Sequence, residues 1–167
     1  MANNIDTLLQ MKANWTSSDF VFFWGHTDRG EGLSKACLSQ WFQCPFIVDN
    51  QYYNCAEQYM MAEKARIFGD EEIRQQIFAE YNQMAMKKLG RKVRNYNDIT
   101  WKEKGFDVVV KGNIAKFSQN EKLLNYLYLL VKRFWWKPVL KIPFGVLVLM
   151  SYHLKQYNLI NGKEKTF

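Results

Sequence analysis

The apolar residues between positions 54 and 130 recur at helical spacing. A first helix is predicted from Asn54, which can act as N-cap with Glu57 three positions later, to a C-terminal stop at Gly69. In three further segments, apolar side chains return every three or four positions, so four helices are predicted in all. These side chains are Ile73, Ile77, Tyr81 and Met84, then Phe106, Val110, Ile114 and Phe117, and finally Leu123, Leu124, Leu127 and Leu130.

Polar residues that favour N-caps and helix stops set the bounds of the later helices. Asp70 is predicted to cap the second helix, which runs through Lys87 and Lys88 to Gly90. Asp98 is predicted to cap the third helix, and the fourth follows Asn120.

The segment before the first helix predicts a small β component instead. Aromatic and β-branched residues at 20–24 and 46–48 flank a glycine-rich loop at 25–32, which favours two short strands around the loop. The predicted fold is therefore mainly α, or α+β at most: a single helical domain with short strands in the N-terminal third.

Composition supports one globular domain with an unusual C-terminal part. The 167 residues are 48% hydrophobic and 16% aromatic, which excludes a disordered chain. Most of the net charge of +7 lies in residues 131–167, which carry seven basic side chains and one acidic one, Glu164. Residues 131–140 follow neither a helical nor a strand period. We expect a domain at 20–130 and an atypical basic tail at 131–167.

The sequence predicts a cytoplasmic protein without a metal or other cofactor. Three cysteines at spacings of 7 and 11 match neither a disulfide framework nor a zinc-ligand pattern. The polar first residues do not resemble a secretory leader, and the longest apolar run of the tail, at 142–150, is shorter than the roughly 20 residues of a membrane span. His26 lies in the glycine-rich loop with no second histidine near it in the sequence, so a metal role is not expected.

Several polar residues of the predicted helices are candidates for chemistry, each with a structural alternative. Glu57 and Lys64 are seven apart and project from the same side of the first helix, with Tyr59 and Glu63 beside that surface. The alternative for Glu57 is a capping-box carboxylate, and for Lys64 and Glu63 a solvated helix face. Trp101 could instead anchor the core or its rim.

Arg91, just past Gly90, could serve only the carbonyls of the preceding helix. The sequence contains neither a Ser/His/Asp order nor a G-x-x-x-x-G-K phosphate loop.

Several sequence blocks resemble the NADAR (YbiA-like) family from about Phe22 to Leu130. The most specific block is C-A-E-Q-Y-M-M-A-E-K-A at 55–65. The others are L-S-Q-W at 38–41, P-F-I-V-D at 45–49, F-G-D at 68–70, G-R at 90–91, Trp101 and N-I-A-K-F-S-Q-N at 113–120.

The resemblance implies a mostly helical fold and hydrolysis of an N-glycosidic bond. Its characterised substrates are ribosylamino-pyrimidine phosphates of riboflavin synthesis or ADP-ribose linked to a base. By this resemblance Glu57 is the active-site carboxylate and Trp101 the aromatic wall, both assigned as catalytic. Tyr59, Lys64 and Arg91 are assigned to substrate binding, the two cations as phosphate contacts.

The expected partner is a phosphorylated, nucleoside-like small molecule, not a nucleic acid or a membrane. One alternative is a non-catalytic module that binds ADP-ribose or nucleotides. Another is a nucleic-acid or membrane surface formed by Phe134, Trp135 and Trp136 among basic residues, but this depends wholly on the atypical tail. The sequence makes no prediction of oligomeric state.

The tail departs from the family, whose members carry further active-site acids in L-V-E-A-S-P and W-x-G-x-N-L blocks. When the codons of residues 134–137 are read in a shifted frame, they encode Leu-Val-Glu, whichever synonymous codons are used. Residues 138–145 and 161–167 permit Ala-Ser-Pro and Trp-Gln-Gly-Lys-Asn-Leu blocks in the same frame. We therefore expect a frameshift near residues 126–131, in the genome or in the sequence record, and weak or absent hydrolysis by the chain as written.

Overall fold

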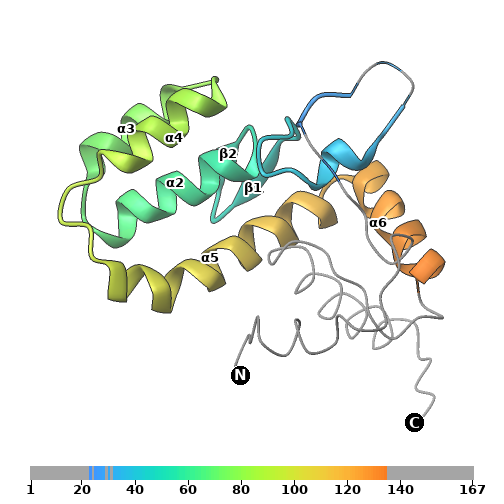
Figure 1. The fold of residues 1–167 in the computed structure, drawn as a ribbon. Coiled ribbons are helices and arrows are strands. Elements are labelled where there is room, and N and C mark those ends of the chain that lie inside the picture. The colour runs from blue at the N-terminus through green and yellow to red at the C-terminus, as the bar shows by residue number, and fades with distance from the viewer. Residues whose placement is uncertain (1–22, 24, 29, 31, 135–167) are drawn as a thin grey trace, which may run out of the picture.

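The computed structural model describes residue 23, residues 25–28, residue 30 and residues 32–134. Within them, the prediction of a mainly helical domain with short strands in the N-terminal third is confirmed (Figure 1). None of the described helices is long and apolar enough to cross a membrane. The elements are a short 3₁₀ helix η3 (Lys35–Leu38), strands β1 (Phe46–Val48) and β2 (Gln51–Tyr53), and helices α2 (Ala56–Ile67), α3 (Glu71–Ala79), α4 (Gln83–Arg91), α5 (Asp98–Ser118) and α6 (Glu121–Phe134).

The two strands form an antiparallel hairpin joined by Asp49 and Asn50. Both turn residues have positive φ, 50° and 62°, as a two-residue type I′ turn requires. Phe46 and Tyr53 face each other and are buried. The strand predicted at 46–48 is confirmed, and the sequence analysis missed its partner at 51–53. The strand predicted at 20–24 lies almost entirely outside the described residues.

Helix α2 begins one residue later than predicted. Its N-cap is Cys55 rather than Asn54, and Cys55 makes no side-chain capping bond. The capping-box bond to the backbone N–H of Asn54, expected from Glu57, is made by Gln58 instead. Gln58 Oε1 accepts this N–H at 2.7 Å. The predicted stop is confirmed, because Gly69 follows the helix with φ 71°.

The single helix predicted from Asp70 to Gly90 is wrong, since the structure breaks it into α3 and α4. Gln58 Nε2 donates to the carbonyls of Ile77 at 2.9 Å and Glu80 at 3.0 Å, where α3 ends. Asn82 then caps α4 by accepting the Ala85 N–H at 3.0 Å. A buried amide from another helix therefore stabilises the break, which the local spacing of apolar residues could not reveal.

At two further helix starts, the predicted cap is correct to within one residue. Asp70 caps α3 as predicted, and its side chain accepts the Ile73 N–H at 3.3 Å. Helix α5 begins one residue away from the prediction, because Asn97 accepts the Thr100 N–H and Asp98 is the first helical residue. The fourth predicted helix, after Asn120, is confirmed as α6.

Helix α2 lies at the centre of the core, against α3, α4, α5 and the hairpin (Figure 1). Small residues allow this close packing: a Cβ on Gly112 of α5 would lie 2.4 Å from the ring of Tyr59, and one on Gly90 of α4 would meet Met61. The face predicted for α5 is therefore only partly correct. Phe117 is buried, whereas Phe106, named in the predicted stripe, is only half-buried.

A second cluster of buried residues joins η3 to the C-terminal end of α5 and to α6. It contains Cys37, Leu38, Cys44, Phe117, Leu123 and Leu127. This cluster fixes η3 on α5, and the residues that follow η3 lead through the β1–β2 hairpin to the start of α2. Of the predicted tail at 131–167, residues 131–134 belong to α6 and the remainder lies outside the described residues. The frameshift predicted near residues 126–131 falls within α6 and stays a prediction.

Candidate active site

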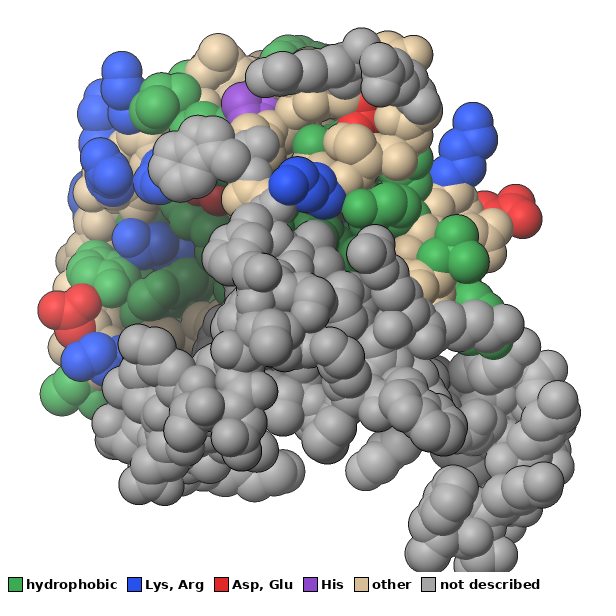
Figure 2. Space-filling view, turned by 45° about the vertical axis from the view of Figure 1, so that its right-hand side comes forward, with side chains coloured by type: hydrophobic (Ala, Val, Ile, Leu, Met, Phe, Trp, Pro, Cys, Tyr) green, Lys and Arg blue, Asp and Glu red, His purple; other side chains and the backbone are tan. Residues whose placement is uncertain are grey.

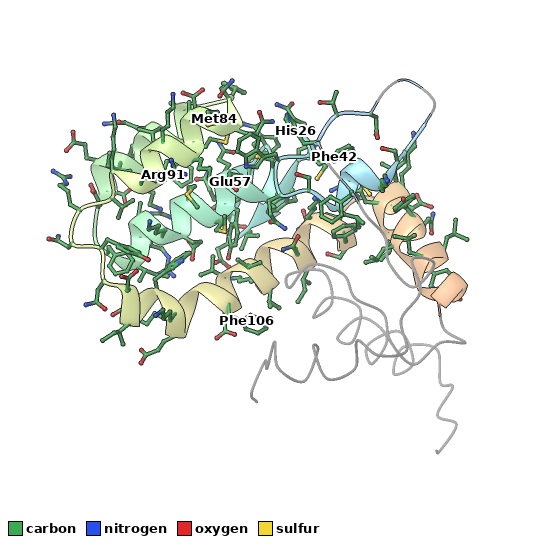
Figure 3. The ribbon with its side chains drawn as sticks, viewed as in Figure 1. His26, Phe42, Glu57, Met84, Arg91 and Phe106 are labelled. Carbon is green, nitrogen blue, oxygen red and sulfur yellow. The ribbon has the colours of Figure 1, made fainter. Side chains whose placement is uncertain are left out.

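Glu57 lies in the first turn of α2 and is only 4% exposed. The capping-box interpretation of Glu57 is wrong, because Gln58 makes that bond. The backbone N–H of Glu57 instead donates to the carbonyl of Gln40 at 3.0 Å. The Glu57 carboxylate is thus held at a helix N-terminus without a capping role, and Figure 3 shows it between Arg91 and His26.

The environment of Glu57 changes its acidity in opposing ways. Burial raises the pKa of the carboxyl group above its usual value, because the charged form loses water. The positive charges of Lys87 and Arg91 on α4 and a hydrogen bond with the Trp41 side chain lower that pKa, but by less. The net effect is a carboxyl group whose pKa lies above its usual value.

Trp41 is the residue around which this site is built. The His26 ring contacts the Trp41 ring in a T-shaped arrangement with centroids 5.4 Å apart, and Lys87 Nζ lies 5.6 Å from the indole. Gln83 Nε2 of α4 donates to the Trp41 carbonyl at 3.1 Å. The sequence analysis assigned Trp41 no role, although its L-S-Q-W block was a signal for one.

Two buried polar residues of α5 hold the segment that carries Trp41. Lys116 Nζ, fully buried, donates to the carbonyls of Cys37 at 2.6 Å and Ser39 at 2.7 Å. Asn113 accepts a hydrogen bond from Gln40 Nε2 at 3.0 Å. The Gln40 carbonyl in turn accepts the backbone N–H of Glu57. The N-I-A-K-F block of α5 therefore fixes the positions of both Trp41 and Glu57.

Lys64 and Trp101 lie near each other at the other end of α2, an arrangement that the sequence analysis did not predict. Lys64 Nζ donates to the carbonyl of Gly90 at 2.8 Å and lies 4.1 Å from the Tyr96 ring and 6.0 Å from the Trp101 ring. Burial lowers the pKa of Lys64. The solvated-face interpretation of Lys64 is therefore wrong, and the indole of Trp101 lies over Gly105 of its own helix.

An ion pair between the buried Asp70 and the exposed Arg94 holds the loop between α4 and α5 that carries Tyr96. Asp70 accepts hydrogen bonds from the backbone N–H of Arg94 at 2.8 Å and from its guanidinium at 2.5 and 3.1 Å. These bonds hold the pKa of Asp70 well below its usual range. The F-G-D block thus fixes the loop next to Lys64, and the exposed residue Arg91 lies just before it on α4.

Tyr59 does not join the other predicted site residues. It is 2% exposed and packs in the core against Tyr53 and Gly112, on the side of α2 away from Glu57. Glu63 is also buried, so the solvated-face interpretation fails for it too; its carboxylate forms a bidentate pair with Arg66. Both Tyr59 and Glu63 line a separate surface cavity of about 410 Å³.

Figure 2 shows the face that carries His26 hollowed beside it, with basic and hydrophobic side chains in the hollow. Within the described part of the chain, no group of three or more His, Cys, Asp or Glu side chains could hold a metal ion. The contacts bring together the Glu57 carboxyl group, the Trp41 indole and the positive charges of Lys87 and Arg91.

These features define a helical domain in which a buried carboxyl group lies close to an indole ring and to positive charges on α4. The chain belongs to the NADAR domain family, which matches residues 22–133. The match ends close to Leu130, where the sequence resemblance to the family also ends.

Relatives of the chain support this assignment. An N-glycosidase of Acanthamoeba polyphaga mimivirus is 40% identical over 116 residues, which cover 65% of each chain. Protein irg-1 of Caenorhabditis elegans is 44% identical over 71 residues, 41% of this chain and 34% of that protein. The chain thus spans about two thirds or less of these relatives.

The fold is similar to that of a solved structure. The NMR structure of the E. coli protein YbiA matches with a TM-score of 0.62 and 21% identity, over 89% of this chain and 90% of that chain. The predicted YbiA-like fold is therefore confirmed.

Proposed function

We propose that this protein is an N-glycosidase, which hydrolyses the bond between the anomeric carbon of a ribose and the nitrogen of a base. The observation that carries the proposal is the buried Glu57 carboxyl group, which contacts Trp41 and lies within the field of Lys87 and Arg91. The mimivirus relative named as an N-glycosidase supports the same activity.

Glu57 has the chemistry that this reaction requires. Cleavage of the C–N bond builds positive charge on the anomeric carbon and ring oxygen, and a nearby carboxylate stabilises that charge. The same carboxylate can accept a proton from the attacking water, because burial has raised its pKa. Water then forms the new C–O bond while the base departs with the C–N electron pair.

The substrate we propose is a phosphorylated, nucleoside-like molecule: a ribosylamino-pyrimidine phosphate or an ADP-ribosylated base. Arg91 and Lys64 lie on the same side of α2 as Glu57 and supply positive charge for phosphate, while Trp101 and Trp41 offer flat surfaces to a base. The cytoplasm is the compartment we propose, because buried free cysteines suit a reducing environment.

The direct test incubates the purified protein with a ribosylamino-pyrimidine 5-phosphate or with an ADP-ribosylated base, and separates the released base by chromatography. The proposal expects enzyme-dependent release of free base and the corresponding sugar phosphate. Absence of release from both substrate types contradicts it.

A second candidate is a non-catalytic module that binds ADP-ribose or nucleotides. It is favoured by one observation, that residues 131–167 contain only one carboxylate, Glu164, where family members carry further active-site acids. Calorimetric binding of ADP-ribose without any base release supports this second function over the first.

The phosphate contact is tested by comparing Arg91→Met with Lys88→Met, which removes a positive charge from an exposed residue of the same helix. Arg91→Met is expected to raise the KM for the phosphorylated substrate about tenfold, since a charged hydrogen bond contributes about 1.5–3 kcal/mol. Its effect on the dephosphorylated substrate is expected to be small. Equal effects of the two variants contradict a phosphate contact at Arg91.

A further inference from the structure

The proposed reaction leaves one chemical requirement unmet by Glu57. A purine, pyrimidine or aminopyrimidine nitrogen departs readily only when an acid protonates it. The charged groups that act on Glu57 are the cations of Lys87 and Arg91, which supply positive charge. A second proton-exchanging group is therefore needed on the opposite side of the reacting bond.

His26 is placed where such a group is required. Its ring contacts the indole of Trp41, whose side chain also hydrogen-bonds with Glu57. Because both groups contact the same indole, Trp41 brings His26 and Glu57 to one site. Figure 3 shows His26 on the side of Glu57 opposite to Arg91.

Hydrogen bonds fix the loop that carries His26. Asp28 Oδ1 accepts hydrogen bonds from the backbone N–H and the hydroxyl of Ser34, at 3.1 and 2.5 Å. Ser34 is itself the N-cap of η3, which Lys116 ties to α5. The loop that carries the imidazole is therefore attached by half-buried and buried hydrogen bonds to the same framework that holds Trp41.

We propose that His26 is the general acid of the N-glycosidase reaction and donates its proton to the departing base. The inference rests on the proposed function and adds a catalytic residue to it. Histidine suits the role because it can be protonated near neutral pH and release its proton in the transition state.

The step is balanced in atoms and electrons. Water oxygen forms a bond to the anomeric carbon and gives a proton to Glu57. The C–N bond breaks, its electron pair moves to the nitrogen, and that nitrogen receives the proton of His26. Proton exchange with solvent then restores the neutral carboxyl group to carboxylate and the imidazole to imidazolium.

The experiment compares two leaving groups in wild-type protein and in His26→Gln. One substrate is a ribosylamino-pyrimidine 5-phosphate, whose nitrogen must be protonated to leave. The other is 4-nitrophenyl ribofuranoside 5-phosphate, whose 4-nitrophenolate leaves as a stable anion. Thr27→Ala, an exposed neighbour in the same loop, is the matched control.

For His26→Gln we expect kcat to fall about 100-fold or more on the pyrimidine substrate and to change less than about threefold on the nitrophenyl substrate. Thr27→Ala is expected to match the wild type on both. Equal losses on the two substrates, or no loss on the pyrimidine substrate, overturn the role of His26 and leave the N-glycosidase activity standing. If wild-type protein hydrolyses neither substrate, the proposed function fails and the role of His26 fails with it.

Discussion

Replacement of Lys116 by methionine tests whether the buried network behind the site positions Trp41. Lys116 Nζ donates to the carbonyls of Cys37 and Ser39. Ser39 lies one residue before Gln40 and two before Trp41. Methionine keeps the length of the aliphatic side chain but removes the ammonium group. The Ser39 carbonyl retains the backbone N–H of Phe42 as a donor at 3.2 Å.

The expected cost follows from these contacts. A buried carbonyl that loses its donor costs about 1–3 kcal/mol, and this applies to Cys37. Each hydrogen bond from a charged donor contributes about 1.5–3 kcal/mol, but removal of the ammonium group also recovers the cost of burying its charge. The net expectation is a loss of about 2 kcal/mol in the free energy of unfolding. For a domain of this size, that lowers the Tm by about 6 °C.

Urea denaturation and the kcat of base release measure the two consequences. The control is Lys111→Met on the same helix, whose ion pair with Asp49 is exposed at both ends and contributes less than about 1 kcal/mol. We expect Lys116→Met to lower kcat about tenfold through displacement of Trp41, with KM little changed. If Lys116→Met is as stable and as active as Lys111→Met, the network does not position the site.

Other outcomes follow from the same structure. Gly112→Ala is expected to destabilise the protein by about 2 kcal/mol in urea denaturation, because the new Cβ would lie 2.4 Å from the Tyr59 ring, and an unchanged midpoint contradicts this packing. Burial raises the pKa of the Cys37 thiol to about 12 and that of Cys44 to about 11, so the folded state keeps protons that the unfolded state loses, and the Tm is expected to fall as pH rises from 8.5 to about 11. A shallower fall of the Tm in a Cys37→Ala/Cys44→Ala double variant than in the wild type identifies these thiols as a cause, and equal falls contradict it. Sequencing of the DNA across residues 120–140 is expected to yield a second open frame that encodes Leu-Val-Glu, and early stop codons in that frame contradict a frameshift.

The helical part of the fold could be predicted because its apolar residues are periodic and its caps are local. Gly69, Asp70 and Asn120 mark helix ends through their own backbone preferences and short side chains. The break between α3 and α4 could not be predicted, since Gln58, some twenty residues earlier, provides the hydrogen bonds that stabilise it. The buried face of α5 was also hidden, because glycine leaves no apolar signal at a close contact.

The candidate site was predictable in part. The spacing of Glu57 and Lys64 placed both on one side of α2, and the structure keeps them there with Trp101 near Lys64. Trp41 contacts Glu57 and His26 contacts Trp41, both from irregular segments that precede α2, so no periodicity in the sequence connects them to Glu57. Such residues are revealed only when tertiary structure brings the loop and helix together.

The central claim is tested most directly by the kcat of base release in Glu57→Gln and Glu63→Gln. Both glutamates are buried on α2, but Glu63 pairs with Arg66 on the other side of the helix. Because burial raises the pKa of Glu57, the folded state binds more protons than the unfolded state at pH values above the usual pKa of a glutamate. The free energy of unfolding therefore falls as pH rises through that range. The neutral glutamine removes that cost, so Glu57→Gln is expected to stay folded at neutral pH, with kcat at least about 100-fold lower. Glu63→Gln is expected to retain kcat within about threefold of the wild type, whereas equal turnover by wild type and Glu57→Gln contradicts the account.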